Sequence, residues 1–260
     1  MDLSRHLDDE HPLPRVRHAA IITDLHLPEW HDKPTAQAFL DYIEETQPDT
    51  VVYGGDFMDM ESMSSHGGNP SPPKLIDEAR ESRRYLRSAK RVAPHARHIL
   101  LEGNHEDRLD RWLADNAPAL VGTITVPQLL QLDELGIEWI TEEKILWLGK
   151  LAVIHGKWCN DLHAKKHLLE YGHSSLYGHT HRHQVYTKGQ MNGDVHGAFG
   201  MPSACSRDAP YMKGRPAGWT QGFGVVYVRP NRDFNVYTAI TAHGSLVAPN
   251  GRVYPKAERA

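Results

Sequence analysis

Histidine, aspartate and asparagine recur at five places where a short apolar run meets a turn. The five runs end in Asp24-Leu25-His26, Gly54-Gly55-Asp56, Gly103-Asn104-His105-Glu106, His155-Gly156 and Gly178-His179-Thr180-His181. Imidazole, carboxylate and amide groups bind divalent ions such as Mn, Fe, Zn or Co, and a set without cysteine disfavours a structural zinc–thiolate site. Singly, each residue is better interpreted as a surface histidine, a turn asparagine or a helix cap. Together, they predict one metal site.

Two of these motifs place chemically active side chains two residues apart, at Asp24 and His26 and at His179 and His181. In an extended chain, residues i and i+2 project to the same side, so each pair is expected to point into one pocket. Glycines beside the ligands permit tight turns and close approach of the backbone.

The segments before the motifs have the composition of buried strands, and helical spacing separates them. Strands are expected at 18–23, 50–53, 98–101, 151–154 and 174–177, and helices at 35–46, 74–93, 105–115 and 161–171. Strand–helix–strand units predict parallel strands, whose carboxyl ends meet at one edge and bind ligands there. After residue 183, short runs at 185–187, 222–228 and 234–237 predict antiparallel strands. The order of helices and strands within residues 118–148 is not predicted.

The order of the five motifs resembles the calcineurin-like metallophosphoesterase family. Its signature is D-x-H, G-D, G-N-H-[D/E], a lone His and G-H-x-H, and all five parts occur here between residues 24 and 181. The resemblance implies an α/β fold, the calcineurin-like four-layer αββα sandwich of two mixed β-sheets flanked by helices. It also implies two divalent metal ions, with Mn²⁺ favoured and Fe, Zn, Ni, Co or Mg as alternatives. Residues 157–183 are similar to small phosphoesterases of phages and bacteria.

The resemblance also implies a role for each matching residue. The first ion is expected on Asp24, His26 and His181, the second on Asn104, His155 and His179, and Asp56 between the two. His105 and Asp56 are the expected catalytic residues. His105 would donate a hydrogen bond or a proton to the phosphoryl or leaving oxygen, which an imidazole can do near neutral pH.

Several charged residues near the motifs have open roles. Glu106 or Asp59 is expected to orient a ligand histidine, and the sequence does not decide which. Arg108 and Arg182 could bind phosphate through two hydrogen bonds, although salt bridges are the more ordinary interpretation.

The implied function is hydrolysis of phosphate esters by a hydroxide that bridges two ions roughly 3.5–4 Å apart. A nucleotide or nucleic-acid phosphodiester is the favoured substrate. The G-H-x-H ending is shared by the family's phosphodiesterases, nucleases and nucleotide hydrolases, and residues 55–59 lack the D-R-G segment of its protein phosphatases. The alternatives are a phosphomonoesterase and a non-catalytic metal-binding scaffold. The substrate-selecting segments are expected at 28–34, 61–73 and 201–216.

Length and composition agree with a globular protein, since 40% of the 260 residues are hydrophobic and 24% are charged. Residues 1–17 are expected to form an N-terminal arm, 18–245 the metallophosphoesterase domain and 246–260 a C-terminal tail. A cytoplasmic protein without membrane contact is expected, because the chain has no signal-like start and no run of about 18 apolar residues. The net charge of −4 argues against a dedicated nucleic-acid binder.

The remaining candidate residues are interpreted as structural or surface residues rather than as parts of the site. Two cysteines, Cys159 and Cys205, are too few for a disulfide framework and are interpreted as structural thiols. The arginines at 80, 84, 87 and 91 could meet a nucleic-acid backbone, but a solvated helix face paired with Glu78 and Glu81 is favoured. Most of the histidines at 66, 163, 167, 173 and 183 are expected to be solvated, and the last of them could line the pocket.

Overall fold

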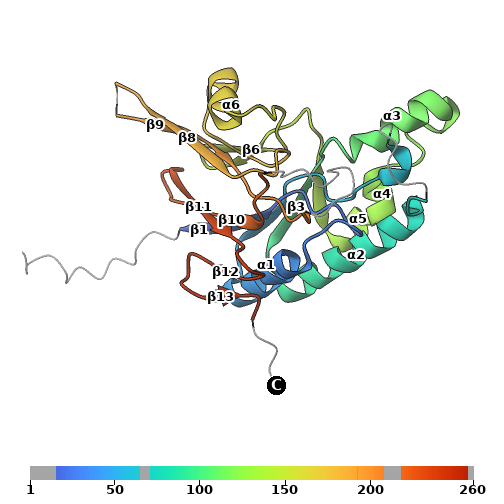
Figure 1. The fold of residues 1–260 in the computed structure, drawn as a ribbon, viewed down its shortest axis with the longest axis horizontal. Helices are drawn as coiled ribbons and strands as arrows, with labels where there is room; N and C mark the ends of the chain where they lie inside the picture. Colours follow the sequence, from blue (N-terminus) through green and yellow to red (C-terminus); the bar gives the residue numbers. More distant parts are fainter. Residues whose placement is uncertain (1–15, 65–70, 192, 208–217, 257–260) are drawn as a thin grey trace, which may run out of the picture.

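The computed structural model describes residues 16–64, 71–191, 193–207 and 218–256, and two mixed β-sheets form its centre (Figure 1). The first sheet has the order β11-β10-β1-β2-β3-β4 and the second the order β5-β6-β7-β9-β8. The first contains β1 (Arg17–Ile22), β2 (Thr50–Tyr53), β3 (Arg97–Leu101), β4 (Ile137–Ile140), β10 (Gly222–Val228) and β11 (Phe234–Ile240). The second contains β5 (Leu146–Leu148), β6 (Leu151–Ile154), β7 (Ser175–Tyr177), β8 (Gln184–Gly189) and β9 (Val195–Gly200).

Strand direction explains why the ligand motifs meet. Strands β1 to β4 are parallel, and β10 and β11 extend that sheet as antiparallel strands. Strands β6, β7 and β9 are also parallel, with β5 and β8 antiparallel at the two edges. The five strands that precede the ligand motifs therefore end on one side of the molecule.

Helices cover the outer face of each sheet. They are α1 (Lys33–Thr46), α2 (Leu75–Val92), α3 (Asp107–Asn116), α4 (Val126–Leu130), α5 (Leu132–Leu135) and α6 (His163–Tyr171), with 3₁₀ turns η1 (Glu61–Met63) and η2 (Pro118–Leu120). The start of α1 is set locally, because the Asp32 side chain accepts from the Thr35 N–H and Pro34 suits the first helical turn. Figure 1 shows α1 and α2 beside the first sheet and α6 beside the second.

Alternate residues of β1 separate the layers. Ala20 and Ile22 belong to the core under α1 and α2, whereas Ala19 and Ile21 belong to the core between the sheets. A third core joins α6 to the outer face of β7 through Leu168 and Tyr177. A strand segment buried on both faces needs apolar residues at every position, as β1 has from Ala19 to Ile22, whereas Arg17 and His18 at its start are not buried. The expected α/β architecture of two mixed sheets flanked by helices is confirmed.

The C-terminal segment differs from the loose tail expected at 246–260. Strands β12 (Leu246–Val247) and β13 (Val253–Tyr254) pair with each other, and Leu246 and Tyr254 are buried in the helix-side core. The Tyr254 ring packs edge-on against Tyr42 at 5.6 Å between ring centroids. Residues 246–256 thus pack against the rest of the fold, because Leu246 and Tyr254 share one core with Phe39 and Tyr42 of α1. The expected arm lies almost wholly outside the described residues.

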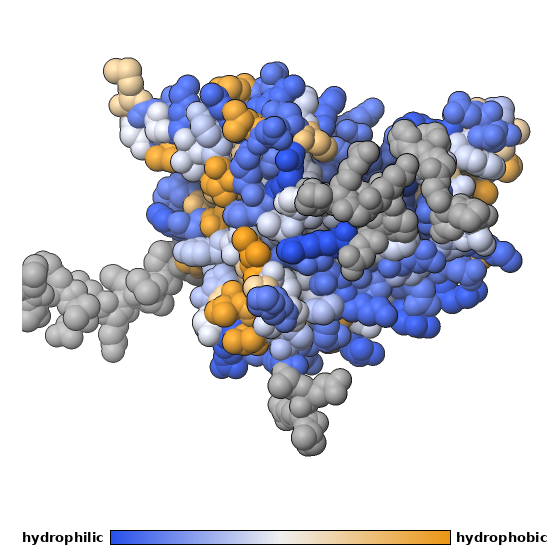
Figure 2. Space-filling view, viewed as in Figure 1, coloured by the Kyte–Doolittle hydropathy of each residue, from blue (hydrophilic) through white to orange (hydrophobic). Residues whose placement is uncertain are grey.

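The outward face of α2 is a solvated, charge-paired surface. Arg80 pairs with Asp77 and Arg84 with Glu81, and all four side chains are largely exposed. Glu78, expected to be a partner of this face, is instead fully buried on the other side of the helix. Figure 2 shows mostly hydrophilic residues over α2, with a hydrophobic patch over β12 and β13 and smaller ones toward β8 and β9. Among the described residues, no helix is both long enough and apolar enough to cross a membrane.

Candidate metal centre

The first group of converging side chains joins the ends of β1, β2 and β7. His26 Nε2 lies 3.2 Å from His181 Nε2, and His181 Nε2 lies 3.4 Å from Asp24 Oδ1. One ligand atom from each of Asp24, His26, Asp56 and His181 falls within 4.8 Å of all the others, and all four residues are buried. Residues far apart in the chain thus present two imidazoles and two carboxylates to one point.

A second group adjoins the first and shares Asp56 with it. His155 Nε2 lies 3.3 Å from Asp56 Oδ1 and 3.1 Å from Asn104 Oδ1. A ring nitrogen of His179 completes a cluster with Asp56 and His155 in which the ligand atoms are within 4.8 Å of one another. The seven expected ligands therefore gather in two groups with one carboxylate in common.

The chemistry of these atoms fits divalent cations. His26 Nδ1 is bonded to Asp59 Oδ1 and His155 Nδ1 to the Gly54 carbonyl, so in each neutral ring the lone pair is on Nε2, facing the cluster. His179 Nδ1 is buried without a hydrogen-bond partner in the described residues. With the rings of His26 and His155 neutral, the atoms that converge are all acceptors, which is a poor hydrogen-bond network and a good ligand set.

The backbone at the ligands is left-handed. Asp24, His26, Asp56, His179 and His181 all have φ between 48° and 65°, and they are five of the ten described non-glycine residues with positive φ. Such backbone is unfavourable for these residue types and tends to occur at functional sites. The extended geometry expected for the pairs 24/26 and 179/181 is therefore wrong. Each pair converges through a tight turn after its strand rather than through strand alternation.

Asp59, and not Glu106, contacts one of the expected ligand histidines, which answers the question that the sequence left open. Its Oδ1 lies 2.9 Å from His26 Nδ1 and 3.2 Å from His105 Nδ1. Glu106 contacts no ligand histidine in the described structure. Its carboxylate instead accepts four backbone N–H groups, from Gly103, Asp56, Phe57 and Met58, at 2.8–2.9 Å. Glu106 thus joins the turn after β2 to the turn after β3.

Opposite charges stabilise one another in the second group. Burial alone would raise the pKa of Asp56, but the nearby His155 and His105 hold it well below its usual range. Burial alone would likewise lower the pKa of His155, but the attraction of Asp56 raises it to about 10. A proton on His155 therefore supplies, in the metal-free protein, positive charge that bound cations would replace.

His105 lies beside the cluster and faces an arginine. Its Nδ1 lies 2.7 Å from the Asp59 carbonyl oxygen, and its Nε2 lies 2.9 Å from an Arg108 nitrogen. Burial opposes protonation, but Asp56 and Asp59 raise the pKa of His105 above its usual value. A protonated ring would turn a second donor toward the guanidinium. An anionic oxygen placed between the two groups would accept from both.

The structure revises the interpretation of two histidines, agrees with the salt-bridge interpretation of Arg182 and adds a contact for Cys205. His163 and His167 are buried against Tyr177 rather than solvated, with His163 Nδ1 2.7 Å from the Tyr177 hydroxyl. Arg182 bonds the Cys159 carbonyl and pairs weakly with Asp161. Cys205, interpreted from the sequence as a structural thiol, has its sulfur within 4.8 Å of a ring nitrogen of His26. Sequence spacing offered no signal for that thiol. His66 lies outside the described residues.

Sequence comparison assigns the family. A family model described as calcineurin-like phosphoesterase matches residues 18–190, and the chain belongs to this family. Membership implies a metal-dependent phosphoesterase with a dinuclear centre of divalent ions, for which the two clusters provide candidate ligands.

Two phage proteins and one solved structure are similar to the chain. The Gene 54 protein of Mycobacterium phage L5 is 30% identical over 229 residues, covering 80% of this chain and 88% of that protein. The Gene 54 protein of Mycobacterium phage D29 is 28% identical over 236 residues, covering 81% and 89%. A dimetal phosphatase from Danio rerio aligns at 11% identity with a TM-score of 0.39, over 86% of this chain and 99% of that one.

Proposed function

We propose that the protein is a phosphodiesterase that cleaves a nucleotide or nucleic-acid phosphodiester at the centre built on Asp56. The observation that carries this proposal is the pair of buried clusters sharing the Asp56 carboxylate, with His105 and Arg108 beside them. Two divalent ions, when bound, would neutralise the charge of the phosphate and supply a nucleophile from water at neutral pH. Mn²⁺ is the ion with which we would begin.

The chain's own residues have distinct roles in this proposal. Asp24, His26 and His181 hold the first position, and Asn104, His155 and His179 hold the second. Asp56 holds the spacing between them, because its two oxygens face different clusters. Arg108 binds a phosphoryl oxygen, and His105 donates a hydrogen bond or proton to that oxygen or to the leaving group.

An aromatic ring at the edge of the site favours a nucleotide substrate. The half-exposed Trp219 packs against His181, with 4.3 Å between ring centroids. An indole face beside the cleaved bond can stack against any of the bases, which stabilises binding by about 1–3 kcal/mol per base. The G-H-T-H ending at 178–181 and the missing D-R-G segment favour a diester over a phosphoprotein.

The test compares a diester with a monoester at equal metal loading. Protein loaded with Mn²⁺ should cleave bis-p-nitrophenyl phosphate faster than p-nitrophenyl phosphate. Asp56→Asn should abolish this activity, and His105→Ala should lower kcat about 10²–10⁴-fold. The matched controls Asp133→Asn and His95→Ala, both at exposed positions, should leave it unchanged. A monoester preference would instead support a phosphomonoesterase, and metal binding without cleavage of either ester would support a scaffold.

A further inference from the structure

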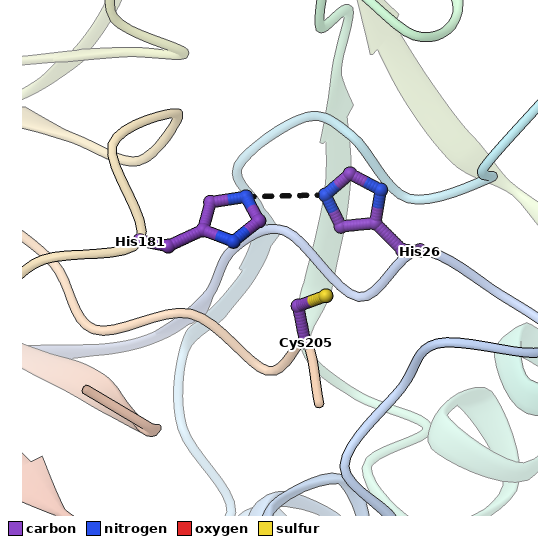
Figure 3. A group of neighbouring side chains, drawn as sticks. All are labelled: His26, His181 and Cys205. Atoms are coloured by element: carbon purple, nitrogen blue, oxygen red, sulfur yellow. Dashed lines mark hydrogen bonds between the residues drawn. The ribbon is translucent and has the colours of Figure 1, made fainter. Parts of the chain in front are cut away.

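Cys205 lies beside the two histidines of the first metal position. It is fully buried, and its sulfur and one ring nitrogen each of His26 and His181 all lie within 4.8 Å of one another. Figure 3 shows the three side chains arriving from three separate segments, with the sulfur turned toward the space beneath the histidine pair. The thiol is therefore placed among metal-ligating groups rather than in an apolar core.

The backbone holds this thiol in place. The Ala204 N–H donates to the Thr23 carbonyl at 2.9 Å, which ties the residue before Cys205 to the end of β1. The Gln221 side-chain amide donates to the Cys205 carbonyl at 3.0 Å, and His31 forms a β-bridge with Cys205. Contacts on both sides of the residue limit its movement, so its position relative to His26 is a property of the fold.

The histidines themselves indicate a cation at this point. Their Nε2 atoms meet at 3.2 Å, and Nδ1 of His181 is buried with no hydrogen-bond partner in the described part of the chain. Figure 3 shows that one nitrogen of the His181 ring faces His26, and that Cys205 lies beneath the two rings. The Nε2 pair is the evidence for an ion at this point, because two buried imidazole nitrogens that face each other so closely are suited to share one cation, whereas a single ring cannot bind one ion through both of its nitrogens.

We propose that the Cys205 thiolate is a further ligand of the ion held by His26 and His181. The inference rests on the proposed metal centre. On binding, the S–H bond breaks, the proton passes to solvent and a sulfur lone pair forms the metal–sulfur bond, so no redox partner is needed. The same two histidines also belong to the carboxylate cluster of Asp24 and Asp56, so the position has an oxygen-rich side and a sulfur side.

The sulfur predicts which ion the first position selects. Thiolates bind Zn²⁺, Co²⁺ and Fe²⁺ in preference to Mn²⁺ and Mg²⁺, whereas carboxylates and amides suit the harder ions. Among the described residues, no sulfur joins the second cluster of Asp56, His155 and His179. The two positions should therefore differ in metal preference, and Mn²⁺ alone should not be the tightest-binding ion at the first.

Cobalt spectroscopy tests this inference without reference to activity. Metal-free protein is titrated with Co²⁺ under anaerobic conditions, and the near-ultraviolet charge-transfer band of a cobalt–thiolate bond is recorded. The band should appear in the unmodified protein and in Cys159→Ser, a control that removes the exposed second cysteine. It should be absent from Cys205→Ser, while the visible bands of bound cobalt remain. In Cys205→Ser, the ratio of the zinc affinity to the manganese affinity should also fall at least tenfold.

The outcomes separate this inference from the metal centre itself. Cobalt that binds the unmodified protein without a thiolate band overturns the role of Cys205 and leaves the centre intact, and no variant needs to fold for that result. A band that persists in Cys205→Ser overturns it as well. Failure of any cobalt to bind overturns the proposed centre and the inference together.

Discussion

Asp59→Asn should weaken metal binding at the first position without disturbing the second. The Asp59 carboxylate accepts from His26 Nδ1 at 2.9 Å, which holds the ring with its Nε2 toward the cluster. It is buried, and the hydrogen bonds from His105 and His26 overcome the effect of burial and keep the pKa of Asp59 below its usual value. It therefore acts as a charged acceptor under all ordinary conditions.

The size of this effect follows from the bonds that change. An asparagine oxygen is neutral, and hydrogen bonds to charged groups contribute about 1.5–3 kcal/mol against about 1 kcal/mol for neutral ones. Losing that difference at His26 corresponds to roughly a tenfold loss of affinity, and loss of ring orientation extends the range to about 100-fold. His155 takes its orientation from the Gly54 carbonyl instead, so the second position should keep its affinity.

Isothermal titration of the metal-free protein with Mn²⁺ or Zn²⁺ measures both positions. The expected result for Asp59→Asn is one weakened and one unchanged binding event, with Asp133→Asn as an exposed control that changes neither. Equal weakening of both events, or no weakening, would refute the argument that Asp59 acts through the orientation of His26.

Three further predictions concern buried ionisable groups. Glu106→Ala should lower the free energy of unfolding by about 3 kcal/mol or more in urea denaturation, because four buried N–H donors lose their acceptor at about 1–3 kcal/mol each; an unchanged midpoint would contradict this. Burial and the nearby Asp59 raise the pKa of Glu78 to about 8. The native state then keeps a proton that the unfolded state releases, so stability should fall as pH rises from 4.5 to 8, and Glu78→Gln should be more stable than the parent at pH 8 but not at pH 5. Burial lowers the pKa of His98 to about 4, where its ring bonds the Tyr53 hydroxyl and a backbone carbonyl. The unfolded state then binds a proton that the native state does not. The free energy of unfolding of the metal-free protein should therefore fall by up to about 3 kcal/mol as the pH is lowered from 6.5 to 4, and His98→Gln should reduce this pH dependence.

The sequence by itself determined the strands and the ligand types that end them. Residues 19–22 of β1 show why, since a segment buried on both faces must be apolar, and a buried polar residue that follows it, such as Asp24, must have a partner or a function. The match of five ordered motifs, from Asp24 to His181, added the family and with it the two-sheet architecture. These features depend on short segments of the chain, so they can be predicted without a structure.

Contacts between distant segments were decided only by the tertiary structure. Asp59 and Glu106 are both acidic residues near ligand motifs, and only the fold directs one to His26 and the other to backbone amides. Burial of Tyr254 depends on its packing against Tyr42 of α1, which lies far away in the sequence. The approach of Cys205 to His26 spans 179 positions in the sequence and rests on backbone contacts among three loops. Contacts of this kind leave no periodic pattern in the sequence, because the free energy that favours them comes from packing of the whole chain.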